Sequence, residues 1–317
     1  MSRILLTAIG SMAAAPAARR YQALGHAVFG CDIYPREWTA LAGELEFFQA
    51  RLATEGEPYV EQLKEAVRRD GLDFLIPLTD PEVDALAPRK AEFRALGCTV
   101  CVPEERVAAL CRRKDTMNRF LAEKQVCRLI PTEIAVSGQP CPFPFPAMVK
   151  PRSGRSSLGQ AVAADEKSYQ TALAGREDCI VQPFLEGDIF CVDVARDAFG
   201  HTRAAARQEL LRNKSGLGMT VEVLPGHPLE AVCAAIAEAV GLVGVVNMEF
   251  IRHGDDFFFL EVNPRFSGGV GFSMAAGMDF AEMMLCCHSC GSVEAFPAAP
   301  KHALLARESA IVLTQLR

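Results

Sequence analysis

Two apolar segments near the C-terminal end most constrain the fold of this chain, because together they predict a β-hairpin with opposed acidic side chains. Residues 247–250 and 258–265 flank a turn-forming run at 253–256 that contains Gly254 and two aspartates. If the loop is Gly254 to Asp256, Glu249 lies opposite Glu261. Directly opposed residues on antiparallel strands have Cβ atoms roughly 4.5–5.5 Å apart, so these carboxylates repel each other unless a cation lies between them.

Asn263 follows Glu261 by two residues and therefore faces the same side of the strand. Two carboxylates and an amide oxygen form a hard ligand set that suits Mg²⁺, an ion that also binds water and substrate phosphates. The hairpin thus predicts a Mg-nucleotide site with Glu249, Glu261 and Asn263 as metal ligands. The alternative is a surface hairpin with both acids in solvent, but the apolar flanks favour a core sheet.

The composition indicates a multidomain protein with small-molecule partners. A chain of 317 residues is expected to form two or three domains. No charge-free apolar stretch approaches the ~20 residues that cross a bilayer, and the short apolar start is no signal peptide, so we expect a cytoplasmic protein without membrane contact. The net charge of −6 gives no basic field for nucleic acid.

The twelve cysteines are expected to be reduced thiols, since they are sparse in a long chain without a secretion signal. The run at 286–290 contains three cysteines and His288, which is a spacing that could hold a metal. It follows an apolar helical pattern, however, where cysteines pack as small hydrophobic residues. Packing is therefore the favoured interpretation, and a metal cluster is the alternative.

The first hundred residues alternate strands and helices. Strands are expected at 4–9, 27–31, 74–78 and 99–102, and helices at 13–24 and at 80–96, the latter interrupted at Pro88. This order predicts an open parallel α/β sheet. The three-glycine dinucleotide fingerprint is missing, so no NAD site is expected. At the carboxyl end of a strand, Thr79, Asp80 and Glu82 could shape a substrate wall, or Asp80 could simply cap the next helix.

The middle of the chain contains a further helix, a small polar loop and a strand that ends in apolar residues. A helix is expected over 104–123 and carries the cluster 112–115. The strand 147–150 ends at Lys150, and its loop 151–159 is small and polar enough for backbone amides to wrap phosphate oxygens. A mobile surface loop is the alternative. The strand beginning at Cys179 leads into residues 182–185, which offer an apolar wall to a flat base.

Taken in chain order, these segments resemble the ATP-grasp superfamily, which contains carbamoyl-phosphate synthetase large subunits, biotin carboxylases and D-alanine:D-alanine ligases. The resemblance covers nearly the whole chain, and the motif at 261–265 (EVNPR) is its most specific part. It implies a mixed α/β and α+β fold. A Rossmann-like pre-ATP-grasp domain would span 1–105 and a two-lobed ATP-grasp module 106–317, with a small lid lobe at about 131–186.

The resemblance also implies roles for particular residues. Those expected to bind ATP are Lys114, Lys150, Gly154, Ser156 and Ser157 at the phosphates, and Gln182, Pro183, Phe184 and Leu185 at the adenine. Glu249, Glu261 and Asn263 would hold one or two Mg²⁺ ions, with Mn²⁺ as an alternative. The catalytic residues would be Arg207, Arg265 and Asn263, with both arginines facing the reacting carboxylate and phosphoryl group. The alternative for Arg207 is a solvated strand residue.

One position departs from the family pattern. Many members have a ribose-binding glutamate two residues after the linker glycine, where this chain has Ile189. Either Asp188 or Glu186 takes that role, or the ribose is held loosely.

The implied activity is an ATP-dependent, ADP-forming carboxylate-amine ligase that acts through an acyl phosphate on amino-acid-like substrates, as a monomer or a homodimer. One alternative is a carbamoyl-phosphate-synthetase-like phosphotransferase that stops at a phosphorylated carboxylate. The other is a nucleotide-binding protein without turnover.

Overall fold

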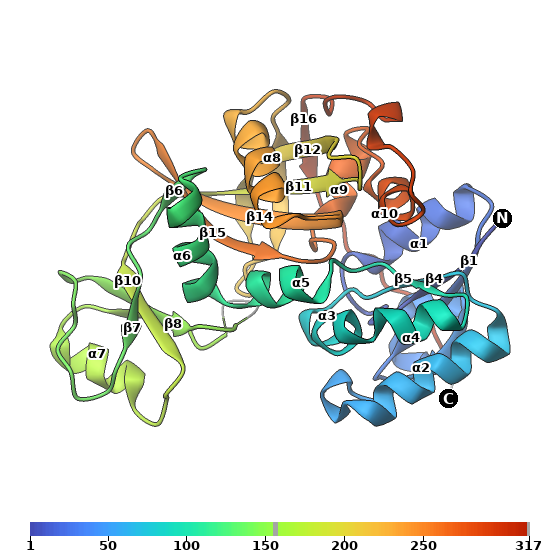
Figure 1. The fold of residues 1–317 in the computed structure, drawn as a ribbon, viewed down its shortest axis with the longest axis horizontal. Helices are drawn as coiled ribbons and strands as arrows, with labels where there is room; N and C mark the ends of the chain where they lie inside the picture. The colour runs from blue at the N-terminus through green and yellow to red at the C-terminus, as the bar shows by residue number, and fades with distance from the viewer. Residues whose placement is uncertain (155–157, 316–317) are drawn as a thin grey trace.

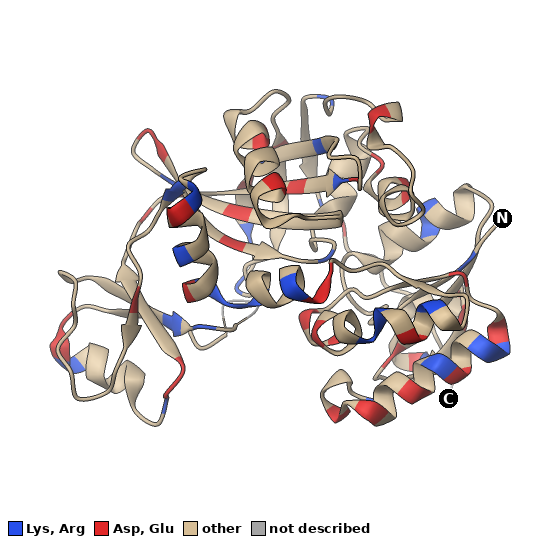
Figure 2. Cartoon of the chain, in the orientation of Figure 1, with Lys and Arg blue, Asp and Glu red and all other residues tan. Residues whose placement is uncertain are grey.

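The computed structural model describes residues 1–154 and 158–315, which contain three β-sheets (Figure 1). Ser156 and Ser157, expected at the phosphates, lie outside the described residues. The mixed α/β class is confirmed. In the described ranges no helix combines the length and apolar character needed to cross a membrane. Acidic and basic side chains are interspersed along the elements in this view, as along helix α2 (Glu57–Asp70) (Figure 2).

The N-terminal sheet is parallel, with strand order β3-β2-β1-β4-β5. Its strands are β1 (Arg3–Leu6), β2 (Ala27–Asp32), β3 (Glu46–Gln49), β4 (Phe74–Ile76) and β5 (Thr99–Val100). Besides α2, its helices are α1 (Ala14–Ala23), α3 (Asp80–Leu86) and α4 (Lys90–Ala95), with 3-10 turns at Arg36–Trp38, Ala40–Gly43, Ala53–Glu55 and Ala87–Arg89. Successive residues of β1 enter cores on opposite faces, which explains its unbroken apolar sequence.

The helices of this half test two expectations. The helix expected over 80–96 is interrupted at Ala87–Arg89, as Pro88 predicted. The single helix expected over 104–123 is wrong, because two helices form there, α5 (Glu105–Arg112) and α6 (Lys114–Lys124). Arg113 is extended between them, with φ −106° and ψ 102°. Lys114 consequently starts a helix and sits at the edge of the site.

The small lobe is a four-stranded antiparallel sheet of order β7-β10-β8-β9, covered by helix α7 (Glu166–Leu173). Its strands are β7 (Glu133–Ala135), β8 (Ala147–Pro151), β9 (Ala161–Ala163) and β10 (Cys179–Pro183), and all of them fall within the range expected for the lid lobe. Tyr169 and Leu173 of α7 pack on Val149 and Val181 to form a separate core.

The large sheet has the order β16-β13-β12-β11-β14-β15-β6 and is antiparallel except for the β15–β6 pair. Its strands are β6 (Arg128–Leu129), β11 (Asp188–Arg196), β12 (Thr202–Arg212), β13 (Gly218–Val223), β14 (Gly244–His253), β15 (Asp256–Asn263) and β16 (Ala303–Ala306). Its helices are α8 (Pro228–Val240), α9 (Val270–Ala275) and α10 (Phe280–His288), with a 3-10 turn at Val293–Ala295. Alternate residues of β11 and β14 pack toward α8 on one face and α10 on the other.

The N-terminal sheet and the C-terminal helices share one core, which fixes the two halves around the site. Helix α1 packs on α9 and α10, and the Tyr21 hydroxyl donates a hydrogen bond to the Ala281 carbonyl at 2.9 Å. Arg20 forms an ion pair with Asp279 at 2.6 Å. The carboxyl ends of the parallel strands are thereby placed against the segment that follows β15.

Candidate active site

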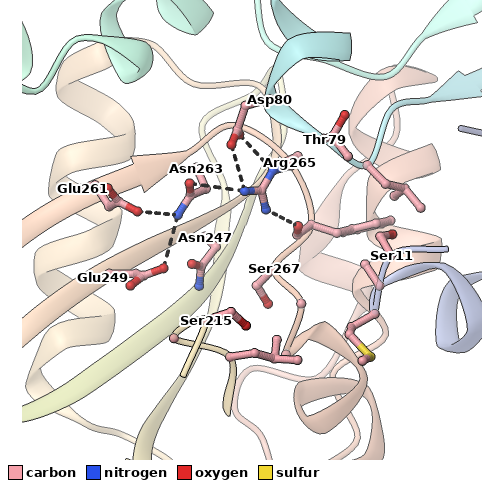
Figure 3. Close-up of a pocket in the computed structure, with 18 of the residues that line it drawn as sticks. Ser11, Thr79, Asp80, Ser215, Asn247, Glu249, Glu261, Asn263, Arg265 and Ser267 are labelled. Atoms are coloured by element: carbon pink, nitrogen blue, oxygen red, sulfur yellow. Dashed lines mark hydrogen bonds and ion pairs between the residues drawn. The ribbon is translucent and has the colours of Figure 1, made fainter. Parts of the chain in front are cut away.

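The β14–β15 hairpin places Glu249 opposite Glu261 and Asn247 opposite Asn263, as the sequence predicted for the acidic pair (Figure 3). The predicted loop was one residue too long, since β15 begins at Asp256. A β-bulge between Glu249 and Phe250 leaves Leu260 unpaired and restores the carboxylate pairing.

The two carboxylates and the amide converge on one point. Asn263 donates from Nδ2 to Glu249 Oε1 and to Glu261 Oε1, each at 3.3 Å. Burial, and then the charge of Glu261, raise the pKa of Glu249 to about 7. Burial also acts to raise the pKa of Glu261, but Lys114, whose Nζ lies 2.9 Å from Oε2, and Lys150 lower it overall. Two half-buried carboxylates that repel each other fit a divalent cation, which would relieve their repulsion.

Two lysines lie beside this pair, as expected. Lys150 follows the apolar residues of β8 and is buried. Burial lowers the pKa of its ammonium group to about 8, although the charge of Glu261 acts to raise it. Lys114 starts α6 and also donates to the Gly154 carbonyl at 3.4 Å. Lys114, Lys150, Gly154 and Glu261 line a small cavity that shares Lys150 and Glu261 with the main one.

The main cavity has a volume of about 840 Å³ and extends from the small lobe to the carboxyl edge of the N-terminal sheet. It is lined by the residues expected at the adenine, which are Gln182, Pro183, Phe184 and Leu185. The Gln182 amide donates a hydrogen bond to the Thr132 hydroxyl at 2.7 Å. No motif marked the other apolar residues of this end, which are Ile130, Met148, Ile189, Ile251 and Leu260.

Asp188, a candidate for binding the ribose, does not line the cavity. It is on the β11 face opposite to the cavity-lining Ile189, and its carboxylate forms an ion pair with Arg252. Glu186 does not line the cavity either, and its carbonyl accepts a hydrogen bond from His253. Strand alternation turns Asp188 away from the cavity, and the ribose role of Asp188 or Glu186 stays a prediction.

Arg265 is held by the N-terminal half of the chain. Its guanidinium donates from Nε to Asp80 Oδ1 at 2.8 Å and from Nη2 to Asp80 Oδ2 at 3.0 Å (Figure 3). The helix cap expected of Asp80 is provided instead by Thr79 and Glu82, whose carboxylate accepts the Thr79 backbone N–H at 3.0 Å. Thr79, Asp80 and Glu82 all line the cavity.

Arg207 is 1% exposed, so its interpretation as a solvated strand residue is wrong. Its guanidinium pairs with Asp193 at 2.6 Å and Glu209 at 3.1 Å, and donates from Nη2 to the Ser267 hydroxyl at 3.1 Å. Although burial opposes it, these carboxylates raise the pKa of Arg207 above its ordinary value. Arg207 and Ser267 both line the cavity, and Ser267 is a residue that motif reasoning missed.

Asn247 was missed as well, although its place opposite Asn263 follows from the predicted hairpin. It is 2% exposed, lines the cavity, and has Nδ2 at 3.4 Å from Asp193 Oδ1. It therefore links the metal-ligand hairpin to the buried charges around Arg207.

The cysteines are free thiols in the described ranges, and most are buried. His288 is half-buried and follows Cys287, and burial of its ring lowers its pKa to about 3. No group of three or more His, Cys, Asp or Glu side chains within residues 1–154 and 158–315 is arranged to hold a metal. Of the three cysteines in the run at 286–290, Cys287 is buried, Cys286 is half-buried and Cys290 is exposed, so packing as a small hydrophobic residue describes Cys287 best.

Comparison with known proteins is consistent with this geometry. Residues 175–309 match the family model "ATP-grasp in the biosynthetic pathway with Ter operon". The chain is 27% identical over 275 residues to formate-dependent phosphoribosylglycinamide formyltransferase of Synechococcus sp., covering 77% of this chain and 64% of that one. For the Burkholderia thailandensis enzyme the identity is 27% over 213 residues, covering 59% and 53%. The chain therefore spans between about half and two thirds of these relatives.

Solved structures share the fold at low identity. Biotin carboxylase from Campylobacter jejuni, in a complex with an ATP analogue, superposes with a TM-score of 0.74 at 16% identity, covering 92% of this chain and 72% of that one. L-amino acid ligase from Bacillus licheniformis gives a TM-score of 0.69 at 14% identity, covering 90% and 73%. This chain therefore matches an ATP-grasp family model over residues 175–309 and shares the fold of these solved structures.

Proposed function

We propose that this protein is an ATP-dependent, ADP-forming carboxylate-amine ligase that joins small, amino-acid-like molecules through an acyl phosphate. The observation that carries the proposal is the convergence of Glu249, Glu261 and Asn263 beside Lys114 and Lys150, at one end of a cavity that continues to Arg265. A triphosphate and a second substrate can both be accommodated in this space. The names of the relative and of the structural neighbour, a formyltransferase and an amino acid ligase, support the same reaction class.

The lysines and the hairpin residues bind and orient the triphosphate. Lys150 and Lys114 direct their ammonium groups to one side of Glu261, where phosphate oxygens would accept hydrogen bonds. Glu249, Glu261 and Asn263 would hold Mg²⁺, which when bound supplies charge neutralisation of the phosphates. We expect Mn²⁺ to substitute for Mg²⁺, and a homodimer stays a prediction.

Arg265 orients the substrate carboxylate, because its planar fork suits paired hydrogen bonds to carboxylate or phosphoryl oxygens. A carboxylate oxygen attacks the γ-phosphate in line, ADP leaves, and the amine then displaces phosphate from the acyl phosphate. No protein nucleophile is required, so positioning and charge stabilisation supply the rate enhancement.

The test is a matrix of carboxylic acids and amines incubated with the full chain and Mg-ATP, with ADP measured enzymatically and products by mass spectrometry. Amide formation that requires both an acid and an amine supports the ligase. ADP release that requires only the acid, with hydroxamate formed when hydroxylamine is added, would indicate the phosphotransferase. Tight ATP binding without ADP release under any combination would indicate a nucleotide-binding protein.

A further inference from the structure

The end of the cavity away from the nucleotide is lined by large apolar side chains that are open to solvent. Met12, Ile33, Tyr34 and Leu52 all line the cavity and are 48%, 41%, 51% and 50% exposed, respectively. Large apolar side chains gathered in a concave site indicate a binding surface, whereas isolated ones carry no such meaning. These four remain exposed with every other described residue in place.

The fold explains why residues far apart in the sequence meet here. Met12 lies in the turn after β1, Ile33 and Tyr34 directly follow β2, and Leu52 follows β3. The strands β1, β2 and β3 are parallel neighbours, so their carboxyl ends meet at one edge of the sheet. Trp38 extends this edge outside the cavity lining, with its ring stacked on Tyr34 at 6.1 Å between centroids and 28° between planes.

The charged groups at this end are already paired within the chain. Asp32 accepts hydrogen bonds from the backbone N–H groups of Gly10 at 2.7 Å and Tyr34 at 3.2 Å. Arg51 pairs with Glu55 at 3.1 Å. The amide of the first βα turn, which could otherwise bind a phosphate, is therefore occupied by a carboxylate.

The nearest other guanidinium groups are also engaged or set back. Arg265 is paired with Asp80 through both carboxylate oxygens. Arg307 does not line the cavity and lies behind Met12, with Nη1 3.8 Å from the Met12 sulfur and Nη2 donating to the Gly268 carbonyl at 2.6 Å. Arg51 is the lining cation that follows β3 at this edge, and a phosphate dianion there would have to compete with Glu55 for it.

We infer that this edge is a subsite for an apolar group, and that one of the two substrates carries an uncharged alkyl or aromatic moiety and no phosphate ester there. The inference rests on the proposed function only for the reaction that takes place at the Arg265 end. A substrate of this kind would differ from that of the relatives whose name specifies a phosphoribosyl group. Whether the apolar group belongs to the acid or to the amine is decided by experiment.

Trp38 is the chain's single tryptophan, so its fluorescence reports on this edge directly. We would titrate the full chain, with Mg-ADP present, with n-alkyl carboxylates from propanoate to octanoate, with the matching n-alkylamines, and with ribose 5-phosphate. The expected result is that affinity rises about two- to fourfold per added methylene in one series, as burial of a CH₂ group predicts, and that ribose 5-phosphate binds more weakly. The series that shows the rise identifies the substrate that carries the apolar group.

Leu52→Asp is the matched variant and Leu304→Asp its control, because Leu304 is also exposed, at 69%, but does not line the cavity. We expect Leu52→Asp to weaken binding of the longest effective ligand about tenfold and Leu304→Asp to leave it unchanged. Because half of Leu52 is already in solvent, the variant is expected to fold, and circular dichroism checks this.

Three outcomes would overturn the subsite: affinity independent of chain length in both series, tighter binding of ribose 5-phosphate, or equal effects of the two variants. The titration requires no turnover. Chain-length dependence without ADP release from any acid and amine would therefore reject the ligase and leave the apolar subsite in place. ADP release without chain-length dependence would do the reverse.

Discussion

Glu261 is the residue on which the metal assignment most depends, because it contacts both Lys114 and Asn263 and faces Glu249. Glu261→Gln keeps the shape of the side chain but removes its charge, so we expect ADP release to fall about 100-fold or more while the protein stays folded. The matched control is Glu222→Gln, which alters an acid that lies on β13 and pairs with His302. Near-normal ADP release by a folded Glu261→Gln protein at moderate Mg²⁺ would refute the metal site.

Lys150 should act on nucleotide binding. Lys150→Ala is expected to weaken binding of a non-hydrolysable ATP analogue about tenfold by calorimetry, with exposed Lys167→Ala as control. Burial lowers the pKa of Lys150 to about 8, so the free protein holds the charged form below pH 8 and loses it above. Affinity of the wild type should therefore fall as the pH rises past 8, whereas a Lys150→Arg protein, whose cation keeps its proton, should not show that fall. Unchanged affinity of Lys150→Ala would make the lysine a structural charge only.

Arg265 should act on the reacting group and not on the nucleotide. Arg265→Lys keeps the charge but loses the planar fork that Asp80 holds at 2.8 and 3.0 Å. We expect turnover to fall about 100-fold with ATP affinity changed less than about threefold. Arg252→Lys, at the ion pair with Asp188 outside the cavity, is the control. A loss of ATP affinity in proportion to the loss of rate would move Arg265 to the nucleotide site.

Among the secondary-structure elements, local patterns predicted those whose partners are near in sequence. The hairpin register was predictable because turn residues and opposed acids lie within 20 residues of one another, and the strand ending at Lys150 because its apolar run is continuous. The Leu260 bulge and the extended Arg113 were not, since neither has a glycine or proline to mark it. Asp188 faces away from the cavity that Ile189 lines, because successive residues of a strand face opposite sides and a one-residue change in phase reverses them.

His288, at the end of α10, is expected to make the stability of the fold depend on pH. The pKa of His288 is lowered to about 3 by burial, while an unfolded histidine titrates near 6.5. As the pH falls below about 6.5 the unfolded chain binds a proton that the folded chain excludes, so stability is lost toward acid, by up to about 1.4 kcal/mol per pH unit for one proton. Urea unfolding at pH 7 and pH 5 measures this loss.

A His288→Gln variant isolates that contribution, because glutamine does not titrate in this range. The loss of unfolding free energy between pH 7 and pH 5 should be smaller in His288→Gln than in the wild type. His253→Gln, at an exposed position on the hairpin, should retain the full loss. Identical pH dependence in all three proteins would show that His288 is protonated, or accessible to solvent, in the folded state.

Contacts between residues far apart in the sequence could not be predicted from local patterns. Asp80 and Arg265 lie 185 residues apart, and Tyr21 and Ala281 lie 260 apart, so no local pattern announces either contact. Both join the parallel N-terminal sheet to the C-terminal helices. They place the sheet edge and the metal-ligand hairpin in one cavity, which allows a substrate bound at the edge to reach the reacting phosphate.

This shared core predicts how the molecule unfolds. Tyr21 is fully buried between the two halves, so Tyr21→Ala should cost about 3–5 kcal/mol and lower the urea midpoint seen by Trp38 fluorescence and by far-UV circular dichroism equally. Tyr169 is as deeply buried but belongs to the separate core of the small lobe. Tyr169→Ala should therefore open that lobe while leaving the Trp38 midpoint close to that of the wild type. If Tyr21→Ala shifted the Trp38 transition alone, the N-terminal sheet would be an independent folding unit. The Asp80 contact to Arg265 would then join two bodies able to separate.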